Sequence, residues 1–186
     1  MYLFSRIVTT QGSPRQVLPW ITQITDHVNA NSPLDVSAWM ANFGAPLGTV
    51  GWSTIVESQS ALVNGTAGLL TDSDYLDLMQ ASAPLVVGPG EDHLRQLVYG
   101  APDEPPPLGA VAVTTTATAA VDRMGEAVAW SIEIAQHVEA VIGSPIAVLI
   151  DSYGTMGQIT WIGVTEHVAA ADAAAEKSAA DASYIG

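Results

Sequence analysis

An internal repeat constrains the fold of this chain more than any other feature of its sequence. Four pairs of short segments match in the same order: GTVGWSTIVES (48–58) with GQITWIGVTEH (157–167), WITQITDHV (20–28) with WSIEIAQHV (130–138), NSPLDV (31–36) with GSPIAV (143–148), and IVTT (7–10) with VTTT (113–116). The alignment places identical residues opposite each other: Trp20 and Trp130, His27 and His137, Gly48 and Gly157, Trp52 and Trp161, Asp72 and Asp181. The sequence therefore predicts two copies of one structural unit.

The first copy has a readable order of elements. Val17, Trp20, Ile21 and Ile24 recur at helical spacing after Ser13-Pro14, which is typical of a helix start. Alternating and β-prone runs flank this helix. The predicted elements are a strand at 2–10, a helix at 14–31, strands at 34–42 and 49–57, a broken helix at 59–82 and a strand at 93–99. This βαββαβ order is the ferredoxin-like unit, an α+β fold.

The domain boundaries follow from a proline-rich segment between the copies. APDEPPPLG is acidic and stiff, so residues 101–108 are predicted to form a linker between repeat 1 (1–100) and repeat 2 (109–186). A ferredoxin-like sheet carries its helices on one face and needs a cover on the other. We expect the two units to cover each other, sheet to sheet, as a pseudo-dimeric barrel.

The second copy is shorter than the first. Nothing in it matches DLMQASAPLVVGPGEDHLRQLVYG, which ends the first copy, so it is expected to lack its last strand. Either the natural chain continues beyond Gly186, which we favour, or another subunit completes the open edge of the sheet.

The duplication and the element order resemble the dimeric α/β barrel superfamily, in the form with both halves in one chain. That superfamily includes antibiotic-biosynthesis monooxygenases, haem-degrading monooxygenases, muconolactone isomerases and stress-response barrel proteins. The resemblance implies a barrel that binds a small molecule, with haem as one cofactor to consider. It covers nearly the whole chain but rests on no motif at the level of residues.

The charge of the chain excludes some partners. Acidic residues outnumber basic ones 19 to 5, which gives a formal net charge of −14. A nucleic-acid binder needs clustered Lys and Arg, so no nucleic acid is expected. No run is long and apolar enough for membrane insertion, and the start MYLFSRIVTT lacks the pattern of a secretory leader. We expect a soluble, cytoplasmic protein that forms a homo-oligomer.

His27 and His137 are the first candidates for catalysis, because they occupy equivalent places on the two predicted helices. Each is a candidate base or haem ligand, or else a partly buried ring whose nitrogen meets a carbonyl group. Asp151 ends the apolar run IAVLIDSYG and is either a general base beside Tyr153 or a turn residue. No motif for a metal site is present.

Trp52 and Trp161 are candidates for lining a ligand pocket, together with Tyr153. The alternative is that both indole rings belong to the core between the two sheets. Arg6 is expected either to hold an anionic ligand or to form a salt bridge with one of the many acidic residues.

Two hypotheses of function remain open. The chain is either a small-molecule enzyme of the monooxygenase or isomerase kind, or a non-catalytic structural protein that assembles with itself or with a partner protein. Converging polar side chains in a pocket would favour the enzyme.

Overall fold

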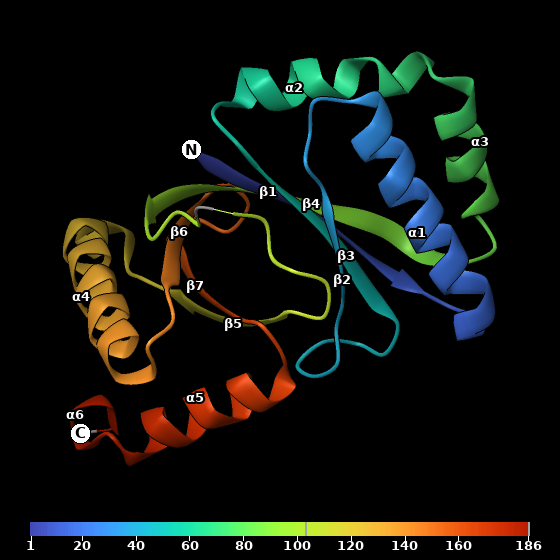
Figure 1. The fold of residues 1–186 in the computed structure, drawn as a ribbon. Coiled ribbons are helices and arrows are strands. Elements are labelled where there is room, and N and C mark those ends of the chain that lie inside the picture. The colour runs from blue at the N-terminus through green and yellow to red at the C-terminus, as the bar shows by residue number, and fades with distance from the viewer. Residues whose placement is uncertain (103, 186) are drawn as a thin grey trace. The chain divides into compact units, whose positions relative to one another are not determined.

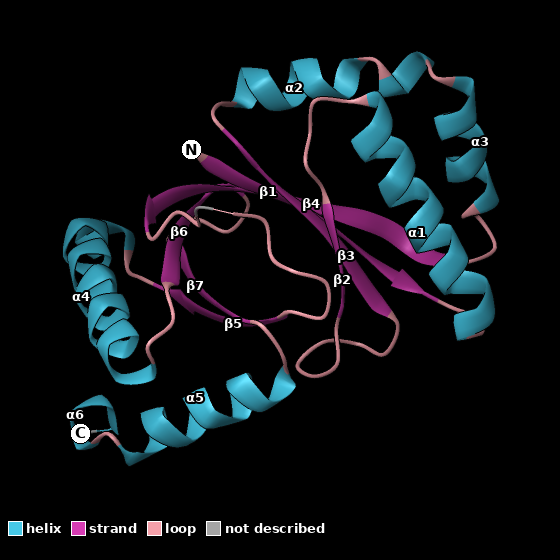
Figure 2. Ribbon diagram, in the orientation of Figure 1, coloured by secondary structure: helices cyan, strands magenta, loops and turns pink. Residues whose placement is uncertain are grey.

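The computed structural model of the chain describes residues 1–102 and 104–185. Helices and an antiparallel sheet give it the predicted α+β class (Figures 1 and 2). The chain divides into two compact units, Met1–Leu94 and Arg95–Gly186.

The first unit follows the predicted order of elements closely. It contains β1 (Tyr2–Thr10), α1 (Pro14–Asn31), β2 (Ser37–Met40), β3 (Thr49–Val56), α2 (Gln59–Ala67), the 3-10 helix η1 (Leu69–Thr71), α3 (Ser73–Ala81) and most of β4 (Val86–Tyr99). The predicted broken helix is thus two α-helices joined by a 3-10 turn. Its sheet has the order β2-β3-β1-β4, with β1–β3 and β2–β3 antiparallel, which is the ferredoxin-like order.

Helix α1 begins where the sequence predicts. Ser13 is the N-cap, its backbone N–H donates to Oε1 of Gln16 at 3.2 Å, and Pro14 occupies the first helical position. The residues at helical spacing, Val17, Trp20, Ile21 and Ile24, are all buried.

The second unit repeats the pattern. Besides the end of β4 it contains β5 (Val111–Thr118), the 3-10 helix η2 (Val121–Arg123), α4 (Met124–Ile142), β6 (Ile146–Tyr153), β7 (Gln158–Thr165), α5 (Val168–Ala180) and α6 (Ala182–Ile185). The strand order is β4-β6-β7-β5, and β5–β7 and β6–β7 are antiparallel. Among the described residues no strand follows α5.

Strand β4 belongs to both units. It runs from Val86 to Tyr99, with β1 and β6 as its neighbours, and the boundary between the units falls inside it at Leu94. Only its second half, 93–99, was predicted. The predicted domain limits at 100 and 109 and the packing of one sheet on the other stay predictions.

The same aromatic pair occurs in both units, although Trp20 is buried and Trp130 is 55% exposed. Trp20 and Trp52 meet edge to face with ring centroids 5.5 Å apart, and Trp130 and Trp161 do so at 6.2 Å. The indole nitrogens of the strand residues bond to the first helix of each unit: Trp52 Nε1 donates to Thr25 Oγ1 and Trp161 Nε1 to the Ser131 carbonyl. Both rings therefore pack against the helices of their own unit, and not between two sheets, which was one of the two alternatives weighed from the sequence.

A pair of glycines also repeats. Gly48 and Gly157 precede the third strand of each unit with φ of +85° and +84°, a left-handed conformation that glycine adopts without strain. Their carbonyls accept bonds from the N–H of Thr10 and Ala119, and a Cβ would collide with the carbonyl oxygen of that same residue. The two units thus share the geometry of this turn, whereas an internal duplication stays a prediction.

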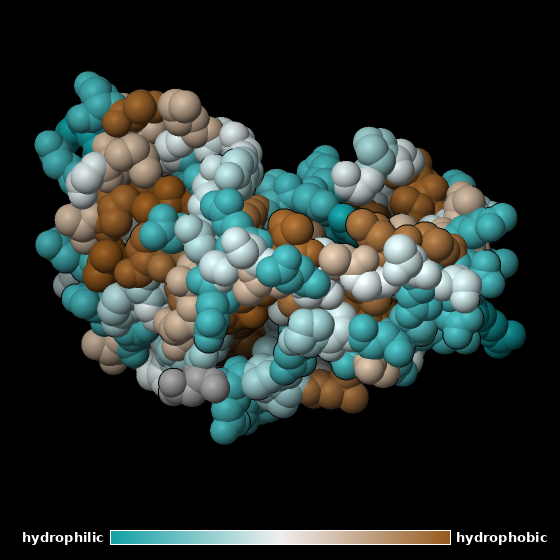
Figure 3. Space-filling model, turned by 90° about the horizontal axis from the view of Figure 1, so that it is seen from above, coloured by the Kyte–Doolittle hydropathy of each residue, from teal (hydrophilic) through white to brown (hydrophobic). Residues whose placement is uncertain are grey.

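The surface mixes hydrophilic and apolar residues, as the face in Figure 3 shows. The most exposed large apolar side chains include Phe43 and Leu47, in the turn between β2 and β3, at 95% and 98%. Among the described residues, no helix has the length and hydropathy that crossing a membrane requires.

Candidate functional site

A groove between α1 and α3 is the candidate site of the first unit. It has a volume of about 660 Å³ and opens to solvent. It is lined by Gln23, Asp26, His27, Ala30 and Asn31 of α1 and by Asp74, Asp77 and Leu78 of α3. It therefore presents three carboxylates, two amides and one imidazole.

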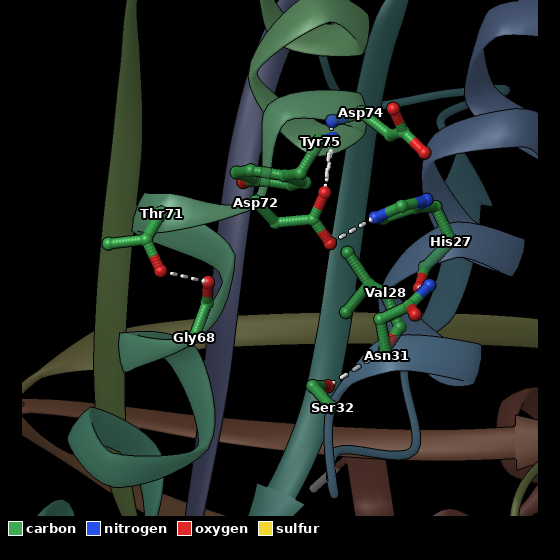
Figure 4. A network of polar contacts seen from close by, with 9 residues as sticks. All are labelled: His27, Val28, Asn31, Ser32, Gly68, Thr71, Asp72, Asp74 and Tyr75. Atoms are coloured by element: carbon green, nitrogen blue, oxygen red, sulfur yellow. Dashed lines mark hydrogen bonds and ion pairs between the residues drawn. The ribbon is translucent and has the colours of Figure 1, made fainter.

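His27 is held in this wall by Asp72. Its Nε2 lies 2.8 Å from Oδ2 of Asp72, and its side chain is only 16% exposed (Figure 4). The ring also stacks on Tyr75, with centroids 6.3 Å apart. Oδ1 of Asp72 accepts bonds from the N–H groups of Asp74 and Tyr75 and so caps α3.

The position of the proton on His27 follows from these bonds. The hydrogen bond with His27, together with those from the helix N–H groups, lowers the pKa of Asp72, so this carboxylate is ionised and can only accept. Nε2 of His27 must then donate, which leaves the lone pair of the neutral ring on Nδ1. For Nδ1 the structure gives no partner among the described residues. An oriented imidazole of this kind can act as a base toward a molecule in the groove.

The second unit contains the same pair. Nε2 of His137 lies 2.8 Å from Oδ2 of Asp181, whose Oδ1 accepts from the N–H of Ser183. His137 is 40% exposed, considerably more than His27. The two predicted histidines thus make equivalent contacts, and their partner is a carboxylate instead of the carbonyl that we weighed.

Asp151 has a different role from the one its place in the sequence suggested. It lies on β6 with a side chain only 2% exposed, and its Oδ1 accepts from Nε of Arg95 on β4 at 2.8 Å. A buried carboxylate in an ion pair is not placed to take a proton from a substrate. Tyr153 ends the same strand and is 61% exposed.

Arg6 forms a salt bridge, the second of the two alternatives that we weighed. Its Nε and Nη2 donate to the two carboxylate oxygens of Asp92, both at 2.7 Å. The bond to Asp92 raises the pKa of Arg6. This bidentate pair occupies the guanidinium, so the structure brings neither Arg6 nor Trp52 into the groove.

Nε2 of His27 and Nε2 of His137 are not free to ligate a haem. Haem ligation by Nε2 would require His27 or His137 to give up its carboxylate, and in both rings that nitrogen is engaged. Among the described residues, no cluster of three or more His, Asp or Glu side chains is placed to hold a metal ion.

Sequence reasoning missed the partners of these side chains. The alignment already placed His27 opposite His137 and Asp72 opposite Asp181, so each copy carries a histidine and an aspartate at nearly the same separation. That joint repetition was a usable signal of contact. For Arg95 and Asp151 the sequence offered no comparable signal, because the pair occurs once.

Comparisons with known proteins bear on the fold. No protein-family model matches the chain, and no curated protein matches it. Among solved structures, it is similar to a candidate monooxygenase from Fusobacterium nucleatum, with 12% identity and a TM-score of 0.69 over 97% of this chain and 81% of that one.

Two further structures show the same likeness. A candidate monooxygenase from Lactobacillus acidophilus matches with 10% identity and a TM-score of 0.64, over 99% of this chain and 83% of that one. An anthrone oxidase-like protein matches with 12% identity and a TM-score of 0.62, over 92% of this chain and 76% of that one. The chain therefore shares a ferredoxin-like α+β fold with these structures, which confirms the predicted resemblance at the level of fold.

Proposed function

We propose that this chain is a small-molecule-binding α/β barrel protein with monooxygenase- or isomerase-like activity, in which His27 is the general base. One observation carries the proposal. His27 lines the groove between α1 and α3, its Nε2 is fixed by Asp72, and its Nδ1 remains available to accept a proton. The likeness to candidate monooxygenases and to an anthrone oxidase-like protein supports this reading of the fold.

The base would act in the same way in either reaction. Nδ1 of His27 takes a proton from a C–H or O–H group of the substrate, and the resulting imidazolium is stabilised by the negative charge of Asp72 at 2.8 Å. In an isomerase the proton returns to another atom of the same molecule. In an oxygenase the substrate anion reacts with dioxygen, which such chemistry takes as its second substrate.

The groove also selects by charge. Asp26, Asp74 and Asp77 line it, and His27 is the one potentially basic side chain among its lining residues. An anionic substrate would meet repulsion from these carboxylates. We therefore expect neutral or cationic substrates.

The test compares two matched variants, H27Q and H137Q. Both remove an imidazole that contacts a carboxylate, but only His27 is assigned as the base. Dioxygen uptake with anthrone and with a panel of neutral hydroxyaromatic compounds measures oxygenation, and deuterium incorporation from solvent measures isomerase-type proton transfer. H27Q should lose about 10²–10⁴-fold in rate, the usual contribution of a general base, while H137Q keeps its rate. Equal rates in the two variants would contradict the assignment.

A second candidate function has its own observation. The same His–Asp contact occurs in both units, and each aspartate also accepts a backbone N–H at the start of the next helix. Such a contact stabilises the packing of two helices without any substrate, as expected for a non-catalytic structural or assembly protein. In that case H27Q and H137Q both lower the melting temperature and no compound of the panel is turned over. The cytoplasmic location and the homo-oligomer stay predictions.

A further inference from the structure

The face of the His27 ring contacts Tyr75, a residue that does not itself line the groove. The two rings stack with their centroids 6.3 Å apart and an angle of 29° between their planes, which is a favourable offset arrangement. Tyr75 belongs to α3 and packs against the hydrophobic core of the first unit, which includes Ile24 and Val50. One aromatic side chain thus connects the imidazole in the groove wall to the core.

Tyr75 is held at both ends. Its backbone N–H donates to Oδ1 of Asp72 at 3.2 Å, in the cap that begins α3. Its hydroxyl interacts with Arg6: the bond to Asp92 raises the pKa of this guanidinium most, and a hydrogen bond with Tyr75 acts in the same direction. Arg6 is itself fixed by its two bonds to Asp92. The phenol ring therefore has little freedom to move away from His27.

The bond to Asp72 alone does not fix the plane of the His27 ring. It restrains Nε2, but the ring can still turn about the line through that hydrogen bond. Nδ1 lies off this line, so such a turn moves its lone pair relative to the groove. A flat neighbour on the face of the ring opposes the turn, because turning would break the stacked contact.

We propose that Tyr75 is a positioning residue of this site, whose ring keeps the His27 imidazole in the one orientation that joins Nε2 to Asp72 and presents Nδ1 to the groove. The inference rests on the proposed function, in which His27 is the base, and it assigns a residue that touches no substrate. Misplacing a reacting group by about 1 Å can cost on the order of 10²-fold in rate, so a fixed ring matters for proton transfer.

Two substitutions of Tyr75 separate the ring from the hydroxyl. Y75F keeps the stacked ring and loses the interaction with Arg6, whereas Y75L keeps an apolar side chain and loses the flat face. The matched control is V17A. Val17 is a buried member of the same core at 5% exposure, and it lies about three turns before His27 on α1. Both Y75L and V17A should lower the melting temperature, so a merely structural role predicts the same behaviour for the two.

The decisive measurement is ¹⁵N NMR of the histidine side chains without any substrate. At about pH 8.5, where an ordinary histidine is neutral, the spectrum shows which ring nitrogen carries the proton. The signals of His27 are those that H27Q removes. The unmodified chain, Y75F and V17A should show one tautomer with the proton on Nε2. Y75L should show a mixture of tautomers, and its Nε2 proton should exchange with water about tenfold faster, the size expected from losing an aromatic contact.

Two results of this measurement would overturn the proposal. One is a Y75L spectrum with the single tautomer and the exchange rate of the unmodified chain. The other is a mixture of tautomers in V17A as well, because any loosening of the core would then have the same effect.

The rates provide a second arm. With a compound of the panel that is turned over, Y75L should lower kcat about 10–10²-fold at a nearly unchanged KM, and Y75F should restore it. A loss of rate in H27Q together with an unchanged kcat in Y75L overturns the positioning role. Equal rates in H27Q and H137Q would instead refute the base, and the NMR measurement, which needs no turnover, would still decide whether Tyr75 orients the ring.

Discussion

The ion pair of Arg95 and Asp151 offers the most direct test of how the second unit is held together. The two side chains are 11% and 2% exposed, and Nε donates to Oδ1 at 2.8 Å. Replacing Arg95 by Met keeps most of the alkyl stem but leaves the carboxylate buried without its counter-charge. Breaking a buried pair in this way costs about 3–5 kcal/mol of unfolding free energy. With a urea m-value of about 2–3 kcal/mol/M, the midpoint should fall by roughly 1–2 M.

The chain supplies a matched control for this experiment. Arg123 and Glu126 form an ion pair at 2.6 Å whose side chains are 70% and 71% exposed. R123M should therefore change stability by less than about 1 kcal/mol. The double variant R95M/D151L, which removes both charges, should recover most of the loss. Similar urea midpoints for R95M and R123M would refute the argument that burial decides the effect.

Two other expectations follow from single contacts. The bond from His27 lowers the pKa of Asp72 below its ordinary 3.8, so this contact stabilises the fold above that pH and is lost as the pH falls through the lower folded-state value. D72N should remove the dependence of stability on pH that this contact causes. Trp fluorescence during an acid titration should then change less steeply with pH than in the unmodified chain. G48A and G157A should each cost more than the roughly 1–2 kcal/mol of a left-handed alanine, because the new Cβ also meets a carbonyl oxygen. G44A, at φ of +77° with nothing nearby, should cost only that strain, and thermal unfolding compares the three.

Much of the fold was accessible from the sequence. Helix α1 has the predicted bounds because apolar spacing and the Ser13-Pro14 start agree. The first half of β4 was missed because Gly88, Pro89 and Gly90 are turn residues by local preference. In the sheet this segment gains pairing with β1, and Gly90 lies close to Val8, so tertiary contacts outweigh the local signal.

The candidate site was only partly accessible. Periodicity placed His27 on the correct helix but did not show that it lines an outer groove, because a histidine near the edge of an apolar stripe can face either way. Its partner Asp72 is separated from it in the sequence by four elements, β2, β3, α2 and η1, and single-sequence patterns do not report such distant contacts. The ion pairs of Arg6 and Asp151 likewise involve residues that are distant in the sequence. Arg6 pairs with Asp92, and Asp151 pairs with Arg95.

Strand β4 has a consequence for how this protein can be inherited and re-used. Since its residues serve the sheets of both units, a genetic break at Leu94 would leave each product with a fragment of a strand. Separated there, each half would present an incomplete strand at the edge of its sheet.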